Sequence, residues 1–376
     1  MRLRKIITIS LFVLTGFFCF AQSGTTIVDS IFSGGISRKF RLYIPLSYDG
    51  SKPVPLVMSL HEINETAAIQ QTYSNYMLIA DTAGFLVLHP QGSTSNPYWN
   101  AGLNTLVDDV MFISQLIDSI KLSYNIDLNK VYCSGYGNGG VMSYYLACHL
   151  PNKIAAVASV AGSMYNFWIL NCKPYRAVPV MEIHGTLDGT VNYAGSAAFA
   201  SVDSVARRWL SLNKCASAAT SYSLPDATNL DNSHAVNYLY SGGTDGSTVE
   251  VYKVIDGSHS WPGAATSMTN TNYDFSASQE IWRFFRKFKL SQFVTTVGLQ
   301  ENQVFNELSL YPSPANDFIT IAGLSEGVFT IYSIEGRKVI SETSATKIAV
   351  SSLAKGIYFL KIKKYDQEHM IKFVKD

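Results

Sequence analysis

The sequence predicts an α/β protein in which a doubly wound, mostly parallel sheet is followed by a small all-β sandwich. Between residues 25 and 290, short β-rich runs alternate with longer helical runs, which is the order that βαβ units produce. After residue 290 the runs are short and β-rich, and Gly, Ser and Asp turns separate them. The chain has 376 residues, of which 47% are hydrophobic and 15% charged, so each domain can bury its own core.

The first of these regions contains the elements of the expected parallel sheet. Strands are expected at residues 39–44, 56–60, 85–88, 131–134, 155–160 and 178–183, followed by two strand-like runs that end at Ile255. Helices are expected at residues 72–82, 106–124, 138–149, 197–213 and 278–289. Strands that alternate with helices imply a sheet covered on both faces, with functional residues at the carboxyl ends of the strands.

The last 70 residues carry the short strands of the expected sandwich. Strands are expected at residues 318–321, 328–332, 338–341, 348–350, 357–362 and 370–374. Four spaced motifs accompany them, at Leu310–Ala315, Ile331–Arg337, Leu353–Tyr358 and Lys372–Val374. This tail resembles the C-terminal sorting domain of the type IX secretion system of Bacteroidetes. The resemblance implies that the secretion machinery is a partner and that the protein is released or attached to the cell surface. A carbohydrate-binding or spacer sandwich is the alternative.

The N-terminus has the layout of a secretory signal. Arg2, Arg4 and Lys5 precede an apolar stretch that runs from Ile6 to Phe20 and ends at Ala21. The stretch is shorter than the roughly 20 residues that a membrane-spanning helix needs, so a cleaved signal is favoured over a retained anchor. No later segment is expected to cross a bilayer. The expected domains are therefore a signal peptide at 1–21, the α/β domain at 22–290, a linker at 291–306 and the sandwich at 307–376.

Charge and cysteine content limit the partners and cofactors. The formal net charge of +1 becomes −2 once the three signal-peptide cations are removed, and no long run of one sign indicates nucleic acid as a partner. Cys133 lies in an apolar run and is expected to be a buried thiol. One disulfide is expected among Cys148, Cys172 and Cys215, with its pairing open. No CxxC pair or tight His/Cys cluster indicates a metal, and no cofactor is expected.

A strand-to-helix turn carries the most specific chemical motif. A nucleophile elbow is written G-x-S-x-G, because the glycines let the backbone pass close to itself while the serine is held at the tip of the turn. Here the turn reads Gly135-Tyr136-Gly137-Asn138-Gly139, so glycine stands where the serine would be. Glycine offers no side-chain atom to acylate, which excludes covalent catalysis at position 137.

The same glycines also match the G-x-G-x-x-G fingerprint of dinucleotide sites, at Gly135, Gly137 and Gly140. That fingerprint requires an acid about 20 residues further on, and no Asp or Glu occurs between Lys130 and Met181. The elbow is therefore the favoured interpretation.

Two later segments follow the elbow in the order of a catalytic triad. Asp188 comes directly after a buried strand, and His259 lies on a loop before the last helix. The order of nucleophile, acid and base is one that triad hydrolases use, with the histidine as general base. The oxyanion hole should use the backbone N–H of Asn138 and the loop after strand 56–60. In that loop Glu62 replaces the usual glycine, and its charge opposes catalysis unless the side chain points to solvent.

Residues from about 26 to 288 resemble the secreted feruloyl esterase and polyhydroxybutyrate depolymerase family of carboxylic ester hydrolases. The stretches that carry the resemblance are Arg41–Pro45, Ala80–Phe85, Val107–Val110, Ser134–Met142, His184–Asp188 and His259–Gly263. The resemblance implies the α/β-hydrolase fold, with Asp188 as triad acid, His259 as base and the Asn138 amide as oxyanion donor. Gly137 matches the nucleophile position and Glu62 the oxyanion glycine, and both depart from the family pattern.

Other polar and aromatic residues have simpler interpretations. Asp108 and Asp109 are expected to cap a helix or complement its dipole. Trp99 and Trp261 flank the expected cleft and either stack on a substrate ring or belong to the core. Neither Ser134 nor Ser143 is expected to reach His259.

Three interpretations of the function remain open. In the first, the domain keeps its pocket but lacks ordinary serine esterase activity and binds an ester or polysaccharide-linked ligand. In the second, His259 and Asp188 activate water directly in the space that the serine left. In the third, the native residue at position 137 is serine and the protein is an ordinary esterase. A structural surface protein is a further alternative. On the first interpretation, Gly137→Ser, alone or with Glu62→Gly, should restore hydrolysis.

Overall fold

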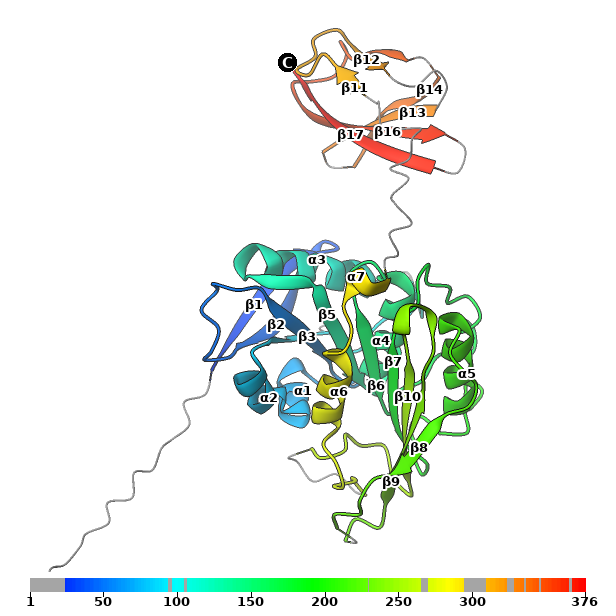
Figure 1. The fold of residues 1–376 in the computed structure, drawn as a ribbon. Coiled ribbons are helices and arrows are strands. Elements are labelled where there is room, and N and C mark those ends of the chain that lie inside the picture. Colours follow the sequence, from blue (N-terminus) through cyan, green and yellow to red (C-terminus); the bar gives the residue numbers. More distant parts are fainter. Residues whose placement is uncertain are drawn as a thin grey trace, which may run out of the picture. The chain divides into compact units, whose positions relative to one another are not determined.

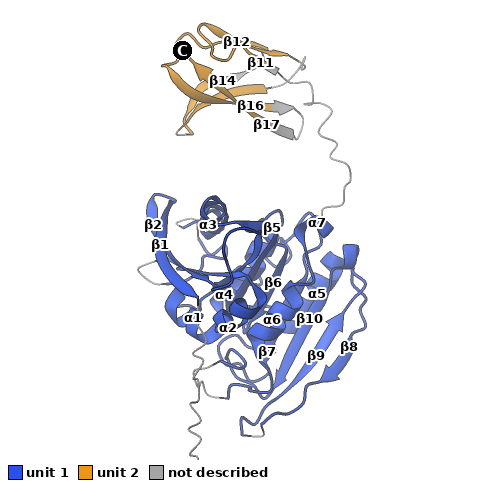
Figure 2. Ribbon diagram, turned by 60° about the vertical axis from the view of Figure 1, so that its left-hand side comes forward, with its two compact units in different colours: residues 1–294 blue, residues 295–376 orange. Residues whose placement is uncertain are grey.

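The computed structural model describes residues 24–93, 97–104, 107–228, 230–264, 270–293, 309–322, 328–334, 336–344, 346–364 and 367–376. The chain forms two compact units, which divide between Val294 and Thr295 (Figure 2). The expected signal peptide and most of the expected linker lie outside the described residues.

The larger unit is built around one ten-stranded sheet with the order β1-β2-β4-β3-β5-β6-β7-β10-β9-β8 (Figure 1). Its strands are β1 (Thr25–Ser33), β2 (Ile36–Ile44), β3 (Val54–Leu60), β4 (Leu86–Pro90), β5 (Ile126–Tyr136), β6 (Ala156–Val160), β7 (Val180–Gly185), β8 (Thr220–Ser223), β9 (His234–Tyr240) and β10 (Val249–Ile255). The strands from β4 to β10 in this order pair in parallel, and the strands at both edges pair antiparallel. The predicted α/β architecture is confirmed.

Helices cover both faces of this sheet. They are α1 (Ala67–Ser74), α2 (Tyr76–Ala83), α3 (Asp109–Ser123), α4 (Asn138–His149), α5 (Val202–Asn213), α6 (Ala277–Phe285) and α7 (Leu290–Phe293). One buried apolar cluster lies between the sheet and α3, α4 and α5, and a second lies between the sheet and α2, α6 and α7. Strand β5 serves both clusters, because Val131 and Cys133 face the first while Tyr132 and Tyr136 face the second.

Three features of the larger unit differ from the expectation. The helix expected at 72–82 is two helices, because Asn75 adopts the left-handed conformation at φ 42° and ends α1. The sequence does not predict strands β1 and β8, because both lie at an edge of the sheet, where most of their residues are exposed or half-buried and form no apolar run.

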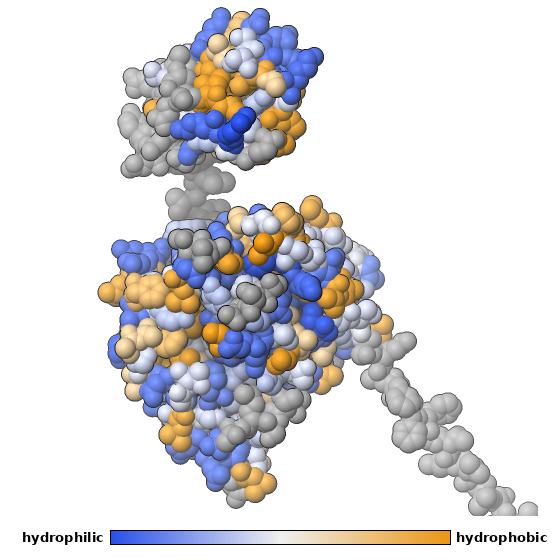
Figure 3. Space-filling view, turned by 180° about the vertical axis from the view of Figure 1, so that it is seen from behind, coloured by the Kyte–Doolittle hydropathy of each residue, from blue (hydrophilic) through white to orange (hydrophobic). Residues whose placement is uncertain are grey.

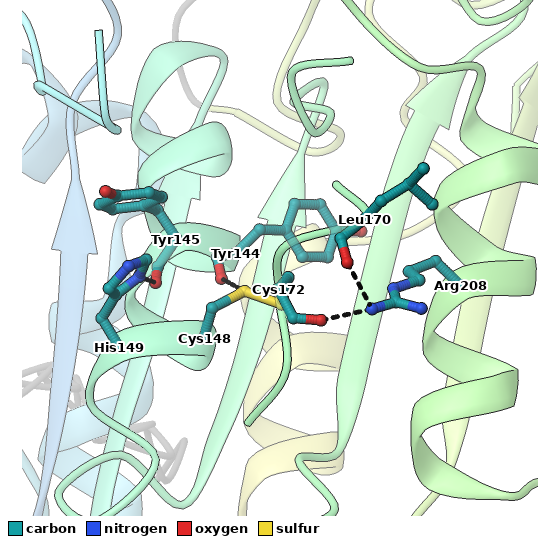
Figure 4. The surroundings of a disulfide bond; sticks show 7 residues. All are labelled: Tyr144, Tyr145, Cys148, His149, Leu170, Cys172 and Arg208. Carbon is teal, nitrogen blue, oxygen red and sulfur yellow. Dashed lines mark hydrogen bonds between the residues drawn. A yellow bond between two sulfur atoms is a disulfide. The ribbon is translucent and has the colours of Figure 1, made fainter. Parts of the chain in front are cut away.

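A disulfide joins Cys148 at the end of α4 to Cys172 in the segment that follows β6 (Figure 4). Cys133 is a buried thiol and Cys215 a half-buried one. The expectation of one bridge among three cysteines is therefore confirmed. The bridge ties the segment after β6 to the helix that begins at the elbow.

The smaller unit contains only strands among its described residues. They are β11 (Ser309–Tyr311), β12 (Phe318–Ala322), β13 (Val328–Ser333), β14 (Lys338–Thr343), β15 (Lys347–Ala349), β16 (Gly356–Lys364) and β17 (Gln367–Lys375). They form a three-stranded and a four-stranded antiparallel sheet, whose inward side chains make one apolar cluster. The small all-β domain is confirmed.

The surface of the larger unit mixes hydrophilic and hydrophobic side chains in small areas on the side that Figure 3 shows. None of the described helices is both long and apolar enough to span a bilayer.

Candidate functional site

The turn between β5 and α4 has the conformation of a nucleophile elbow. Gly137 lies between them at φ 48° and ψ −111°, a backbone conformation that residues with a side chain rarely adopt. Its N–H donates to the carbonyl of Val160, which holds the turn against β6. A Cβ on Gly135 would lie 2.1 Å from the carbonyl oxygen of Gly139. The close approach of the backbone to itself therefore accounts for the glycines without a bound phosphate.

The carboxylate of Glu62 fills the position that a serine side chain would take. A Cβ built on Gly137 would lie only 1.0 Å from Oε2 of Glu62. The backbone N–H of Asn138 donates to the same oxygen over 3.0 Å, and the N–H of Ile63 donates to Oε1 over 2.6 Å. Glu62 is only 9% exposed, so its side chain points into the site and not to solvent. The expected oxyanion donor is thus occupied by an anion of the protein itself.

His259 lies between two carboxylates. Its Nδ1 is 2.7 Å from Oδ2 of Asp188, and its Nε2 is 3.2 Å from Oε2 of Glu62. The structure therefore brings Gly137, Asn138, Glu62, Asp188 and His259 together at the carboxyl edge of the sheet, as the sequence predicts. The partner of Nε2 is not a hydroxyl, which could donate a proton to it, but a carboxylate that accepts one.

This arrangement sets the charge of His259. Burial alone would lower the pKa of the ring, but its hydrogen bonds to Asp188 and Glu62, together with the charges of both groups, raise the pKa to about 9. The ring is therefore an imidazolium at neutral pH, with both nitrogens donating. A general base must be unprotonated, so His259 is in the wrong state for the role that the family resemblance implies.

A second histidine, His184, also contacts the carboxylate of Asp188. The sequence did not indicate this contact. His184 lies with Nδ1 2.8 Å from Glu182 and with Nε2 3.2 Å from Asp188 and 2.7 Å from the carbonyl of Val191. Because these partners only accept, the hydrogen bonds raise the pKa of His184 to about 10, although burial opposes this. Hydrogen bonds from both histidines hold the pKa of Asp188 well below its usual range despite its burial. The spacing of His184 and Asp188 in the sequence could have indicated that the two are close. The contact of His184 with Glu182 is visible only in the structure.

The side chain of Asn138 clamps the elbow to the segment around Trp99. Its Oδ1 accepts the N–H of Trp99 over 2.6 Å, and its Nδ2 donates to the carbonyl of the same residue over 3.1 Å. Sequence reasoning assigned only the backbone of Asn138. The side chain is a positioning group that fixes where the amide points.

Both tryptophans belong to the core, which is one of the two roles expected for them, and the stacking role is not supported. Trp99 is fully buried and Trp261 is 1% exposed. The indole N–H of Trp99 donates to the carbonyl of His61, and that of Trp261 donates to Ser278. Neither ring presents a face to a ligand.

The remaining candidates have structural roles. Asp108 caps α3, while Asp109 is buried against Arg38 and the N–H of Asn100. Ser134 and Ser143 are fully buried. Ser134 donates to the carbonyl of Met58, and Ser143 donates to that of Gly139.

The rim of the site includes a further carboxylate, Glu65, that the sequence did not indicate. Burial and the charge of Glu62 raise the pKa of Glu65 to about 7, while its hydrogen bond with Tyr73 acts in the opposite direction.

Two apolar side chains next to the site are partly open to solvent: Ile63 and Leu187 are about half exposed beside Glu62 and Asp188. Among the described residues, no group of three His, Cys, Asp or Glu side chains is arranged to hold a metal ion.

The Glu62–His259 contact predicts a measurable change in titration. Glu62→Gln keeps a side chain of similar size but removes the negative charge next to Nε2 and replaces one of the two acceptor oxygens by an NH2 donor, so the pKa of His259 should fall by about one pH unit. The imidazole resonances of His259, followed by NMR between pH 5 and 10, measure this. Glu65→Gln is the matched control and should change the pKa much less, because Glu65 bonds to Tyr73 instead. Equal effects of the two variants would contradict the geometry.

Comparisons with known families match both parts of the chain. Residues 104–217 match the family described as Phospholipase/Carboxylesterase, and residues 309–376 match the Secretion system C-terminal sorting domain. The second match establishes that the protein is sorted for secretion to the cell surface or beyond.

Several curated proteins are similar to parts of the larger unit. A bifunctional acetylxylan esterase/xylanase of Neocallimastix patriciarum is 34% identical over 45% of this chain and 24% of its own length. Feruloyl esterase B of Piromyces equi is 31% identical over 42% of this chain and 30% of its own length. Poly(3-hydroxyalkanoate) depolymerase C of Paucimonas lemoignei is 30% identical over 30% of this chain and 28% of its own length. The chain thus spans a third or less of the length of these relatives.

Among solved structures, an acetyl xylan esterase from Aspergillus awamori covers 70% of this chain and 99% of its own, with a TM-score of 0.54 at 14% identity. At this identity the likeness establishes the fold alone. The larger unit is therefore an α/β-hydrolase with a segment that matches the phospholipase/carboxylesterase family and with feruloyl esterase and poly(3-hydroxyalkanoate) depolymerase homologues, and the chain carries a C-terminal secretion sorting domain.

Proposed function

We propose that this secreted protein binds an ester-bearing plant polysaccharide and does not hydrolyse it as a serine esterase. The observation that carries the proposal is the Glu62 carboxylate, which lies at the position of the missing serine and accepts the hydrogen bond of the Asn138 amide. The kind of ligand follows from the relatives, whose names describe esterases of acetylated or feruloylated material.

Three requirements of the serine mechanism fail together at this site. Gly137 supplies no atom that could carry an acyl group. Glu62 places a negative charge where the oxyanion of a tetrahedral intermediate would need a hydrogen-bond donor. His259 is protonated at neutral pH because it lies between two carboxylates. Each change alone would slow hydrolysis, and together they favour a binding role.

The two enzymatic alternatives receive less support. Direct activation of water requires a neutral His259 and an open space at position 137, whereas the ring is protonated and Glu62 fills the space. An ordinary esterase with a native serine would require Glu62 to leave a pocket in which it is only 9% exposed. Gly137 and Glu62 form a sterically matched pair, which favours glycine as the native residue.

Kinetics and covalent labelling test the loss of the serine mechanism. The purified secreted protein should show no burst of p-nitrophenol when it is mixed with p-nitrophenyl acetate, and a fluorophosphonate probe should not label it. Stoichiometric labelling that depends on His259 would contradict the proposal, because another nucleophile would then be at work.

Calorimetry separates a binding protein from a purely structural one. Feruloylated xylan oligosaccharides should release or absorb heat on mixing with the protein. If neither these oligosaccharides nor short hydroxybutyrate esters give a heat of binding, only the interpretation as a structural surface protein remains.

A further inference from the structure

Next to the elbow, the larger unit has a cavity of about 660 Å³ whose chemistry the site described above does not use. It is lined by residues of the segments that follow β6 and β7 and by the start of α5, namely Asn166, Leu170, Ser196, Phe199, Arg207 and Arg208 among others. The volume falls within the range of about 300–1,000 Å³ that is typical of small-ligand pockets.

Tyr165 lies between the candidate site and the cavity wall. A side-chain hydrogen bond joins Tyr165 to Asn138, the residue whose amide bonds to Glu62. On its other side the ring of Tyr165 stacks on Phe199 in the cavity wall, with centroids 4.8 Å apart. One aromatic side chain thus contacts both the residue that positions the elbow amide and the wall of the cavity.

The charge of the lining is positive and uncompensated. The described residues that line the cavity include Arg207 and Arg208 and no Asp or Glu. Asp203, on the same helix, instead accepts a hydrogen bond from Tyr193. Arg207 is exposed and bonds through one nitrogen to the hydroxyl of Ser204, so its guanidinium can receive a second partner. Two cations in one cavity repel each other until an anion joins them.

The wall is held in place before any ligand arrives. Arg208 donates to the carbonyls of Leu170 and Cys172, and the disulfide ties Cys172 to Cys148 on α4 (Figure 4). Among the described residues, no acceptor lies within hydrogen-bond distance of the buried Nε of Arg208. A fixed wall reduces the loss of conformational freedom on binding.

From this lining we propose that the cavity binds an anionic sugar residue, a uronate, of the polysaccharide, with its carboxylate at Arg207 and Arg208. Phe199 and Leu170 supply apolar surface for the sugar ring, and the serines and Asn166 lie within the same lining for its hydroxyls. A planar guanidinium matches a carboxylate through two parallel hydrogen bonds. The inference rests on the proposed function, because it names the charge of the ligand and the place where that charge binds.

The test compares a glucuronoxylan oligosaccharide with the same oligosaccharide after its carboxyl groups are reduced to alcohols. Calorimetry with the whole secreted protein should show about tenfold weaker binding of the reduced form, since one charge-assisted interaction is lost. Arg207→Gln should weaken the acidic form by a similar factor and leave the reduced form unchanged. Arg286→Gln, which removes an exposed arginine of the α6 end, is the matched control and should leave both unchanged.

Each result bears on the inference separately from the proposed function. Equal binding of the acidic and reduced forms, or equal effects of Arg207→Gln and Arg286→Gln, would overturn the anionic subsite while the proposed polysaccharide binding stands. A sulfated oligosaccharide that binds more tightly than the uronate would overturn the carboxylate assignment. Failure of both xylan forms to bind would overturn the proposed function itself, and the subsite with it.

Discussion

The double replacement of Glu62 by glycine and of Gly137 by serine should raise ester hydrolysis by about three orders of magnitude or more over the natural protein. Removal of a nucleophile from a serine hydrolase costs about 10⁶ in turnover, so restoration of even part of the triad gives a large gain. Loss of Glu62 frees the Asn138 amide for an oxyanion and removes one of the two carboxylates that keep His259 protonated. Steady-state and burst kinetics with p-nitrophenyl acetate measure the result.

The single replacement Gly137→Ser should give no comparable gain in hydrolysis. From the sequence we expect hydrolysis from this replacement with or without Glu62→Gly, and the structure favours only the double replacement. Its Cβ would lie 1.0 Å from Oε2 of Glu62, and Glu62 is fixed by the Asn138 and Ile63 amides. Glu62→Gly alone serves as the control, because it opens the pocket without supplying a nucleophile. A folded double variant that stays inactive, although the pKa of His259 has fallen, would show that Asp188 and His259 are not aligned for catalysis.

The architecture of this protein could be predicted from sequence because short β-rich runs alternate with longer helical runs along the chain. The buried strands β3, β6 and β7 and the second half of β5 are short and mostly apolar, and each is separated from the next by at least one helix or turn signal. Elements without such a signal were missed or misplaced. Strand β1 depends on pairing with β2, and the break at Asn75 depends on one residue in the left-handed conformation.

The site was predictable in its residues but not in its interactions. Gly137, Asp188 and His259 follow β5, β7 and β10, whose carboxyl ends lie at the same edge of the sheet, so the fold alone brings the three residues near one another. The direction of the Glu62 side chain depends on two backbone amides and one imidazole from three separate segments. No linear pattern reports such a contact, so the replacement of a hydroxyl by a carboxylate at the elbow became visible only in the structure.

Asp188→Asn should destabilise the protein by about 3–5 kcal/mol at neutral pH, which is the usual cost of removing one partner of a buried ion pair. The carboxylate is fully buried and accepts from His259, from His184 and from the backbone amides of Thr190 and Val191. An amide in its place cannot compensate the charge of two protonated rings. Urea unfolding, compared with Asp256→Asn at an exposed position in the neighbouring loop, measures the loss.

The pH dependence of this loss follows from the direction of each pKa. Because the folded pKa of Asp188 is depressed, its contribution is present above its ordinary pKa of about 3.9 and is lost in acid. The folded pKa of His259 is raised to about 9, so its contribution is fully present below its ordinary pKa. The contribution is lost as the pH rises through the folded pKa. The natural protein should therefore lose stability between about pH 6.5 and 9, whereas Asp188→Asn should show a flatter curve there. Parallel curves for the two proteins would mean that Asp188 does not raise the pKa of His259, and its part in the case against His259 as a general base would fail.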